Sequence, residues 1–188
     1  MKSIITIGFF IVLILSLNSC SSSLPSTSEG EIPGWYEKTP VDPNYLFGKA
    51  SATSLDMQLA VDKATASARA EIGRQTEVLV QGLRKRFDEE VGFGENATLL
   101  QHFEQTTKTV VNTSLSGSRV IETKIFEDGK NWRAYALVQY PIGAANDAFL
   151  QQIKKNNELY TRFRSSEAFK ELEEEVKKYE EWKEKQLK

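Results

Sequence analysis

Side chains with special chemistry are scarce in this chain of 188 residues, which has one cysteine and one histidine. A single cysteine cannot close a disulfide within the chain, and a single histidine cannot form the Cys and His clusters typical of zinc sites. His102 falls in a stretch with a helical pattern, and we interpret it as a surface or packing residue. We therefore expect packing alone to hold the fold, with no metal and no Ser-His-Asp catalytic set.

A surplus of positive charge is also missing, because 24 lysines and arginines are balanced by 26 aspartates and glutamates. Mixed charges are typical of a solvated surface and argue against nucleic acid as a partner. The chain has no phosphate-binding loop or dinucleotide fingerprint, since Gly92 and Gly94 are too sparse and follow a helical pattern instead of a strand. The sequence therefore predicts a non-enzymatic protein without a cofactor.

One long hydrophobic run stands out, over residues 4–17 at the start of the chain. Its 14 residues are fewer than a membrane-spanning helix needs, and this length fits the core of a signal peptide. Lys2 supplies the positive charge that precedes such a core. The run leads directly into Leu17-Asn18-Ser19-Cys20, which contains the only cysteine of the chain.

This tetrapeptide resembles the lipobox of bacterial lipoproteins, in which a leucine stands three residues before a cysteine. The resemblance implies cleavage between Ser19 and Cys20, a diacylglycerol on the Cys20 sulfur and an acyl chain on its amine. The alternatives are an uncleaved anchor followed by a free core cysteine, or a eukaryotic signal peptide. Polar sequence after Cys20 favours lipidation, so we expect the membrane to be a partner. Ser21 resembles the residue that follows the cysteine in lipoproteins of the outer membrane, and we expect that location, facing the periplasm.

Composition divides the chain into four parts. Residues 1–19 are the signal peptide, and residues 20–34 are a tether rich in serine, proline and glycine, with a reach of about 20 Å. Residues 35–142 are predicted to form one α+β domain. Residues 143–188 are predicted to form a helical C-terminal extension.

The domain begins with a predicted strand at residues 44–52, in which Gly48 indicates a bulge or a close helix contact. A long helix follows from residue 55 to about residue 90, capped by Thr53 or Ser54. Residues 91–94 break this helix, and Asn96 can cap a second one. One apolar stripe predicts the core-facing side of the long helix: Ala60, Ala64, Ala68, Ile72, Leu79, Leu83 and Phe87.

A hairpin is predicted between strands at residues 118–126 and 131–140, because Asp128-Gly129 is a preferred turn pair. The sequence thus predicts a small antiparallel sheet with helices packed on one face. On the last strand, the better core candidates share one face: Trp132, Ala134, Ala136, Val138 and Tyr140.

Helical patterns return from residue 146, and Ser165-Ser166 interrupts them and caps a last helix. Apolar residues recur on that helix at heptad spacing: Phe169, Leu172, Val176, Tyr179 and Trp182. The helix either packs this stripe on the domain, or uses it to bind an envelope protein or a second copy of the chain. We favour packing within the chain, because two heptads make a weak coiled coil.

Several of these motifs together resemble the LPP-twenty lipoprotein family over roughly residues 33–142. They are Pro33-Gly34-Trp35, the strand at residues 45–52, the alanine-rich helix start at residues 56–72, and the hairpin strand at residues 130–138. The resemblance implies an antiparallel sheet with a long helix across one face. A similar domain occurs at the N-terminal end of flagellar assembly protein T, which sits in a ring around the basal body. The family has no established enzyme activity, so only the lipidated Cys20 carries over.

Two short charge runs lie near the end of the long helix, Arg-Lys-Arg at 84–86 and Asp-Glu-Glu at 88–90. A solvated helix surface is the simplest interpretation, and contact of the basic run with envelope phosphates or an acidic partner is the alternative. Two functional hypotheses remain. The first is a structural or interaction component of the envelope. The second is a binding module or hydrolase that acts on an envelope ligand, or an accessory subunit of a machine such as the flagellar basal body.

Overall fold

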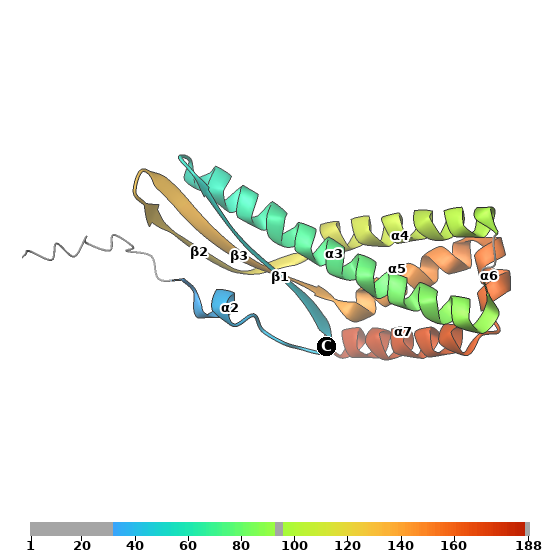
Figure 1. Cartoon of the computed structure of the whole chain (residues 1–188). Coiled ribbons are helices and arrows are strands. Elements are labelled where there is room, and N and C mark those ends of the chain that lie inside the picture. Colours follow the sequence, from blue (N-terminus) through green and yellow to red (C-terminus); the bar gives the residue numbers. More distant parts are fainter. Residues whose placement is uncertain (1–31, 93–95, 187–188) are drawn as a thin grey trace, which may run out of the picture.

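The computed structural model describes residues 32–92 and 96–186, and it has the predicted α+β class. A short helix α2 (Gly34–Glu37) precedes strand β1 (Tyr45–Ser54) and the long helix α3 (Met57–Val91). Helix α4 (Ala97–Gly117) leads into strands β2 (Arg119–Asp128) and β3 (Asn131–Pro141). Helices α5 (Ile142–Lys155), α6 (Asn157–Phe163) and α7 (Glu167–Gln186) complete the chain (Figure 1).

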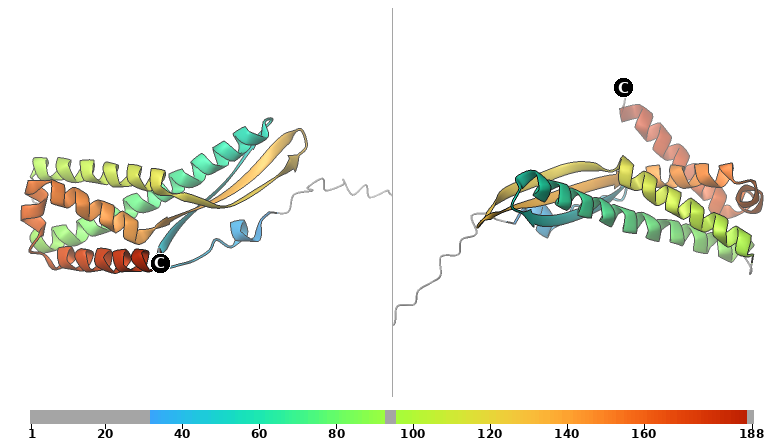
Figure 2. Two further views of the ribbon diagram at one scale, coloured as in Figure 1. Left: turned by 180° about the vertical axis from the view of Figure 1, so that it is seen from behind. Right: turned by 90° about the horizontal axis from the view of Figure 1, so that it is seen from above.

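The molecule is elongated, with the sheet at one end and a bundle of helices at the other, and α3 runs through both (Figure 2). Within residues 32–92 and 96–186, no helix has the length and apolar character required to cross a membrane. The N-terminal hydrophobic run lies outside the described residues.

The sheet has three antiparallel strands in the order β1-β3-β2. The β2–β3 hairpin confirms the predicted turn, with Gly129 at a φ of 63° between the two strands. The strands end at Asp128 and Pro141, slightly beyond the predicted residues 126 and 140. Because β3 lies in the centre, β1 and β2 are both edge strands.

The first half of α3 packs on the face of the sheet that the sequence favoured as core. Ala60, Ala64, Ala68 and Ile72 are fully buried there. They share an apolar cluster with Ala134, Ala136, Val138 and Tyr140 of β3. Small side chains on both elements let the helix lie close to the sheet, which confirms the predicted role of the alanine stripe.

The opposite face of the sheet is also covered, which the sequence analysis did not foresee. Tyr36 of α2 packs edge-on against Tyr135, with ring centroids 4.7 Å apart, and Lys49 donates a hydrogen bond from Nζ to the Tyr36 carbonyl oxygen. Leu137, on the same face as Tyr135, is only 1% exposed. The short helix α2 therefore acts as a clamp on the second face.

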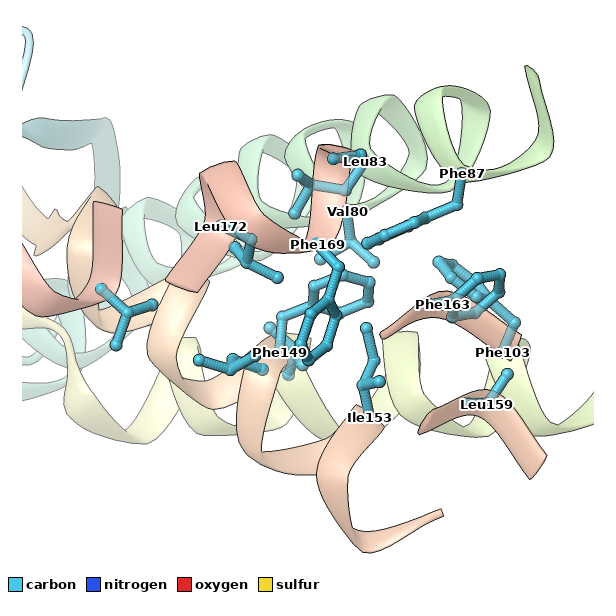
Figure 3. Close-up of a cluster of buried hydrophobic side chains, with 14 of the residues drawn as sticks. Val80, Leu83, Phe87, Phe103, Phe149, Ile153, Leu159, Phe163, Phe169 and Leu172 are labelled. Atoms are coloured by element: carbon cyan, nitrogen blue, oxygen red, sulfur yellow. The ribbon is translucent and has the colours of Figure 1, made fainter. Parts of the chain in front are cut away.

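A second apolar cluster joins the end of α3 with α4, α5, α6 and α7 (Figure 3). Phenylalanines dominate its centre, and Phe87 stacks on Phe163 with ring centroids 4.6 Å apart. From α7, the cluster takes Phe169, Leu172 and Val176, all buried. The first three positions of the predicted heptad stripe are thus used for packing within the chain.

Helix ends follow the predictions with two corrections. Asn96 and Ser166 cap α4 and α7 as predicted, but the cap of α3 is Asp56, whose carboxylate accepts the Leu59 N–H at 2.7 Å. Thr53 and Ser54 still belong to β1, because they pair with Arg133 and Trp132 of β3. Helix α5 starts at Ile142 instead of residue 146, since Pro141 ends the strand and serves as the helix N-cap.

Candidate ligand cavity beside the last helix

The residues with the strongest functional prediction, Ser19 and Cys20, lie outside the described residues. Signal cleavage and lipidation at this point therefore remain predictions. The described residues offer a separate candidate site, which the sequence analysis did not identify.

A cavity of about 370 Å³ opens where β1 begins, α5 begins and α7 ends. This volume lies within the range of small-molecule sites, which begins at about 300 Å³. A backbone hydrogen bond joins the start of α5 to the segment before β1, because the Ile142 N–H donates to the Asn44 carbonyl oxygen at 2.9 Å. The main lining residues come from three elements and the segment before β1: Asn44, Tyr45, Asn146, Glu175, Tyr179 and Trp182.

Gly143 makes the close approach of α7 to α5 possible. A Cβ atom at this position would lie 2.4 Å from the ring of Tyr179 and 2.6 Å from its Cβ atom. Any larger residue would push Tyr179 away from the first turn of α5. A glycine in a helix normally costs stability, so its position here fits a packing requirement.

Aromatic rings form one wall of the cavity. Trp182 stacks on Tyr179 with ring centroids 5.8 Å apart, and Tyr45 approaches Trp182 edge-on at 6.3 Å. Trp182 remains 41% exposed. The last two positions of the heptad stripe thus form a surface of the cavity, whereas the first three lie in the core.

The polar wall is built around Asn146. This residue is 5% exposed, and its Nδ2 donates a hydrogen bond to Glu175 Oε2 at 2.8 Å. Its Oδ1 is buried without a hydrogen-bond partner among the described residues. A buried amide oxygen without a partner is costly, so Oδ1 offers a hydrogen-bond acceptor to a ligand in the cavity. Lys178 adds a positive charge to the rim, opposite in sign to Glu175.

Tyr140 and Tyr179 stay protonated at neutral pH because their pKa values are raised. Burial, with help from Tyr45 and Asp147, raises the pKa of Tyr179 although Arg119 opposes the shift. Burial raises the pKa of Tyr140 to about 12, and Tyr179 and Asp147 add to this effect. Neutral phenols can donate hydrogen bonds and stack on a ligand, but they do not serve as bases or nucleophiles at this pH.

The two charge runs of α3 have contacts within the chain. Arg86 lies 3.4 Å from Glu171 of α7, and Arg84 lies over the ring of Phe103 at 5.7 Å. Glu90 accepts hydrogen bonds from the Glu167 and Ala168 N–H groups at 2.6 and 3.0 Å, so it caps α7. These runs therefore dock the last helix on α3.

His102 lies on α4, partly exposed, with its Nε2 3.5 Å from Glu158 Oε2. Within the part of the chain that the structure describes, no three His, Cys, Asp or Glu side chains gather as a metal site would require. The structure thus brings His102 together with one carboxylate at the surface, away from the cavity residues.

Comparison with known proteins identifies the family to which the sheet and its long helix belong. Residues 33–140 match the LPP20 lipoprotein family, the LPP-twenty family named above, and the chain belongs to this family. Membership of a lipoprotein family implies association with the cell envelope. Neither a curated protein nor a solved structure matches the chain.

The family match ends at residue 140, before α5 begins. Asn146, Glu175, Tyr179 and Trp182 therefore lie in a part of the chain that the family does not cover. Tyr179 and Trp182 gave a signal in the sequence, as the last two positions of the heptad stripe on an otherwise charged helix. Asn146 could not have been found, because its partner Glu175 is 29 residues away.

Proposed function

We propose that this protein is a lipid-anchored lipoprotein of the bacterial outer membrane, facing the periplasm, and that it serves as a non-enzymatic interaction component. The observation that carries the proposal is the segment Leu17-Asn18-Ser19-Cys20 at the end of a short hydrophobic run. Membership of the LPP20 lipoprotein family supports it. The anchor would be the acyl chains on Cys20, since several chains together hold a protein stably at a membrane.

The described side chains support an interaction role over a catalytic one. Tyr140 and Tyr179 have raised pKa values, and the charge runs of α3 hold α7 in place. Beneath the first half of α3, the core is filled by alanines and aliphatic side chains. Among the described residues, the exposed strand edges and the cavity beside α7 offer surfaces for a partner or a ligand.

Metabolic labelling with a fatty-acid analogue tests the anchor. The variant Cys20→Ala should accumulate as the unprocessed precursor and take up no label. The matched control Ser19→Ala keeps a small residue before the cysteine and should be processed and labelled like the parent. Normal labelling of Cys20→Ala would reject the proposal.

Membrane fractionation tests the location. The parent should co-sediment with the outer membrane, because Ser21 follows Cys20. The variant Ser21→Asp should shift toward the inner-membrane fractions, whereas Ser21→Ala should not. A parent protein found only in the inner membrane would contradict the outer-membrane assignment while leaving lipidation intact.

The cavity beside α7 favours a second candidate function, the binding of an envelope ligand that carries an ammonium group. Faces of aromatic rings attract cations, and Tyr45, Tyr179 and Trp182 surround the opening together with the Glu175 carboxylate. The unpaired Oδ1 of Asn146 is an acceptor for an N–H donor.

Fluorescence titration with ethanolamine and with lysine tests this second function. A saturable change in tryptophan emission should occur in the parent and in Trp35→Phe, but not in Trp182→Phe. Binding should also weaken in Glu175→Gln, which keeps the shape of the side chain and removes its charge. If emission shows no saturable change at millimolar ligand concentrations, the cavity does not bind ammonium groups.

A further inference from the structure

The outer edge of β2 has no strand beside it in the described part of the chain. β2 pairs with β3 on one side only, at the end of the β1-β3-β2 sheet (Figure 1). An open edge presents unpaired N–H and C=O groups that can pair with another strand. Proteins usually protect such an edge by covering it, shortening it or charging it.

β2 is also the most exposed strand of the sheet. All seven residues from 119 to 125 are exposed, whereas five consecutive residues of β3, 134–138, are buried. Val120, Ile121 and Ile125 are among them, at 40, 39 and 37% exposure. The apolar cluster beneath α3 includes no residue of this fully described strand. Three branched apolar side chains thus remain more than a third exposed on this strand.

The charged residues of β2 are free of ion pairs except at its end. Asp128 pairs with Arg133 of the neighbouring strand. Arg119, Glu122, Lys124 and Glu127 form no ion pair with any described residue. The exposed edge therefore carries two positive and two negative side chains. A partner strand that places a charge of opposite sign across from them would pair well with β2.

A second copy of β2 meets this requirement at the centre of the strand. We propose that two copies of this chain associate edge to edge through β2, antiparallel, with Thr123 of both copies at the two-fold axis. In this register Glu122 of one copy faces Lys124 of the other, and the two-fold axis repeats this pair. Val120 and Ile125 both lie on the α3 face of the sheet, beside Val138 and Ala134 of β3, and they meet across the new edge. The central charges thus meet their opposites, and apolar residues of the same face meet each other.

The register of β2 against β3 shifts between Val120 and Glu122, which marks a β-bulge. Regular pairing at the axis therefore spans residues 122–124, with Thr123 opposite itself. Beyond this centre, the bulge sets Val120 and Ile121 together opposite Ile125 of the other copy. The extra residue also puts Arg119 and Glu127 on opposite faces of the sheet, so the charge match across the axis consists of Glu122 and Lys124.

Isologous contact is the expected geometry for a surface that is complementary to itself. Opposite charges directly across a strand pair stabilise it, and like charges destabilise it. A shift of two residues is the smallest that keeps side chains on their own faces, and it would set Glu122 opposite Glu122 or Lys124 opposite Lys124. The charges thus select the register centred on Thr123.

Cysteine crosslinking in intact cells tests the proposal on the full chain. In Thr123→Cys the two introduced cysteines face each other, and directly opposed residues have Cβ atoms close enough for a disulfide. Mild oxidation should give a dimer band on a non-reducing gel. In the control Glu127→Cys the introduced cysteines would be about 27 Å apart, at 3.4 Å per residue, and should not crosslink.

Cys20 is present in both variants, so any product that depends on it would appear equally in both. Equal crosslinking at positions 123 and 127, or no dimer at position 123, would overturn the proposal. Failure of the dimer proposal is distinguishable from failure of the proposed lipid anchor, because fatty-acid labelling tests the anchor separately. Co-expression of Glu122→Cys with Lys124→Cys should give a mixed dimer in higher yield than the dimer that either variant gives alone.

Charge exchange in the Thr123→Cys background tests the register. Glu122→Lys places two like-charged pairs across the axis, and the dimer yield should fall about tenfold. Lys124→Glu should have the same effect. The double variant with both substitutions restores opposite charges and should recover the parent yield. A double variant as weak as the single ones would reject this register.

Discussion

Gly48 of β1 faces the carbonyl oxygen of Ala68 on α3 so closely that a Cβ atom at Gly48 would lie 2.2 Å from it. The obstacle is backbone, which cannot rotate away as a side chain would. The alanine at position 68 is fully buried at the same contact. The absence of a side chain on the strand and the small side chain on the helix thus set the distance between the sheet and α3.

We expect Gly48→Ala to lower the free energy of unfolding by about 2 kcal/mol, because α3 or β1 must move to make room. Chemical denaturation of the purified protein measures this loss. Gly82→Ala is the matched control. Gly82 also lies on α3, but a Cβ atom added there would have no neighbouring atom within 4 Å. This control should raise stability by about 0.5–1 kcal/mol, as alanine favours a helix. Equal effects of both substitutions would contradict the close-packing argument.

Local patterns in the sequence were sufficient for most of the sheet and for α3. The four-residue spacing of alanines predicted the buried stripe, and Asp128-Gly129 predicted the hairpin. Gly48 predicted a close helix contact, which the structure confirms. The stripe and the hairpin were predictable because each depends on neighbours within one helix or one turn. Gly48 was predictable because a glycine inside a strand pattern by itself indicates a close approach of backbone.

Features that depend on distant residues could not be predicted in this way. Pairing with β3 extends β1 to Ser54, so this residue belongs to the strand and is not the predicted helix cap. The clamp by Tyr36 requires Tyr135, which is far along the chain. The cavity likewise combines Tyr45, Asn146 and Trp182 from three elements, and no single stretch of sequence contains its pattern.

A second prediction concerns the cap that Glu90 provides for α7. Glu90→Ala should lower the free energy of unfolding by about 1 kcal/mol, because two N–H groups at the start of α7 lose their acceptor. Glu89→Ala is the matched control, since the Glu89 carboxylate is exposed and lies 3.8 Å from Lys85. An exposed ion pair contributes little, so this variant should unfold like the parent. Thermal unfolding of the three proteins in parallel decides between these outcomes.

A third prediction concerns the contact between Gly143 and Tyr179. Gly143→Ala should destabilise the protein by about 1–3 kcal/mol, because a Cβ atom overlaps the tyrosine ring. Tyr179→Ala removes the ring and should make the added methyl group harmless. A double-mutant cycle on the two substitutions should therefore give a coupling of at least about 1 kcal/mol. Additive effects would show that the two residues do not constrain each other.

The fourth prediction is a loss of stability at high pH that depends on Tyr140. Its pKa is about 12 in the folded protein, against 10.0 for an ordinary tyrosine, chiefly because burial disfavours the phenolate. Below pH 10 the phenol is protonated in both states, so it causes no pH dependence. Between pH 10 and 12 the unfolded chain loses this proton while the folded protein keeps it, so stability falls as the pH rises.

The expected loss from Tyr140 is of the order of 2 kcal/mol across this range. Urea unfolding at a series of pH values between 9 and 12 measures this loss of stability. The range covers the pKa of Tyr140 in the unfolded chain, 10.0, and in the folded protein, about 12. Tyr140→Phe removes the ionisable group and should give a flatter decline than the parent, even though the raised pKa of Tyr179 adds a slope of its own to both proteins. The difference between the two slopes isolates Tyr140, because lysines and the other tyrosines are common to both proteins. Identical slopes would mean that burial does not hold the Tyr140 phenol neutral in the folded protein.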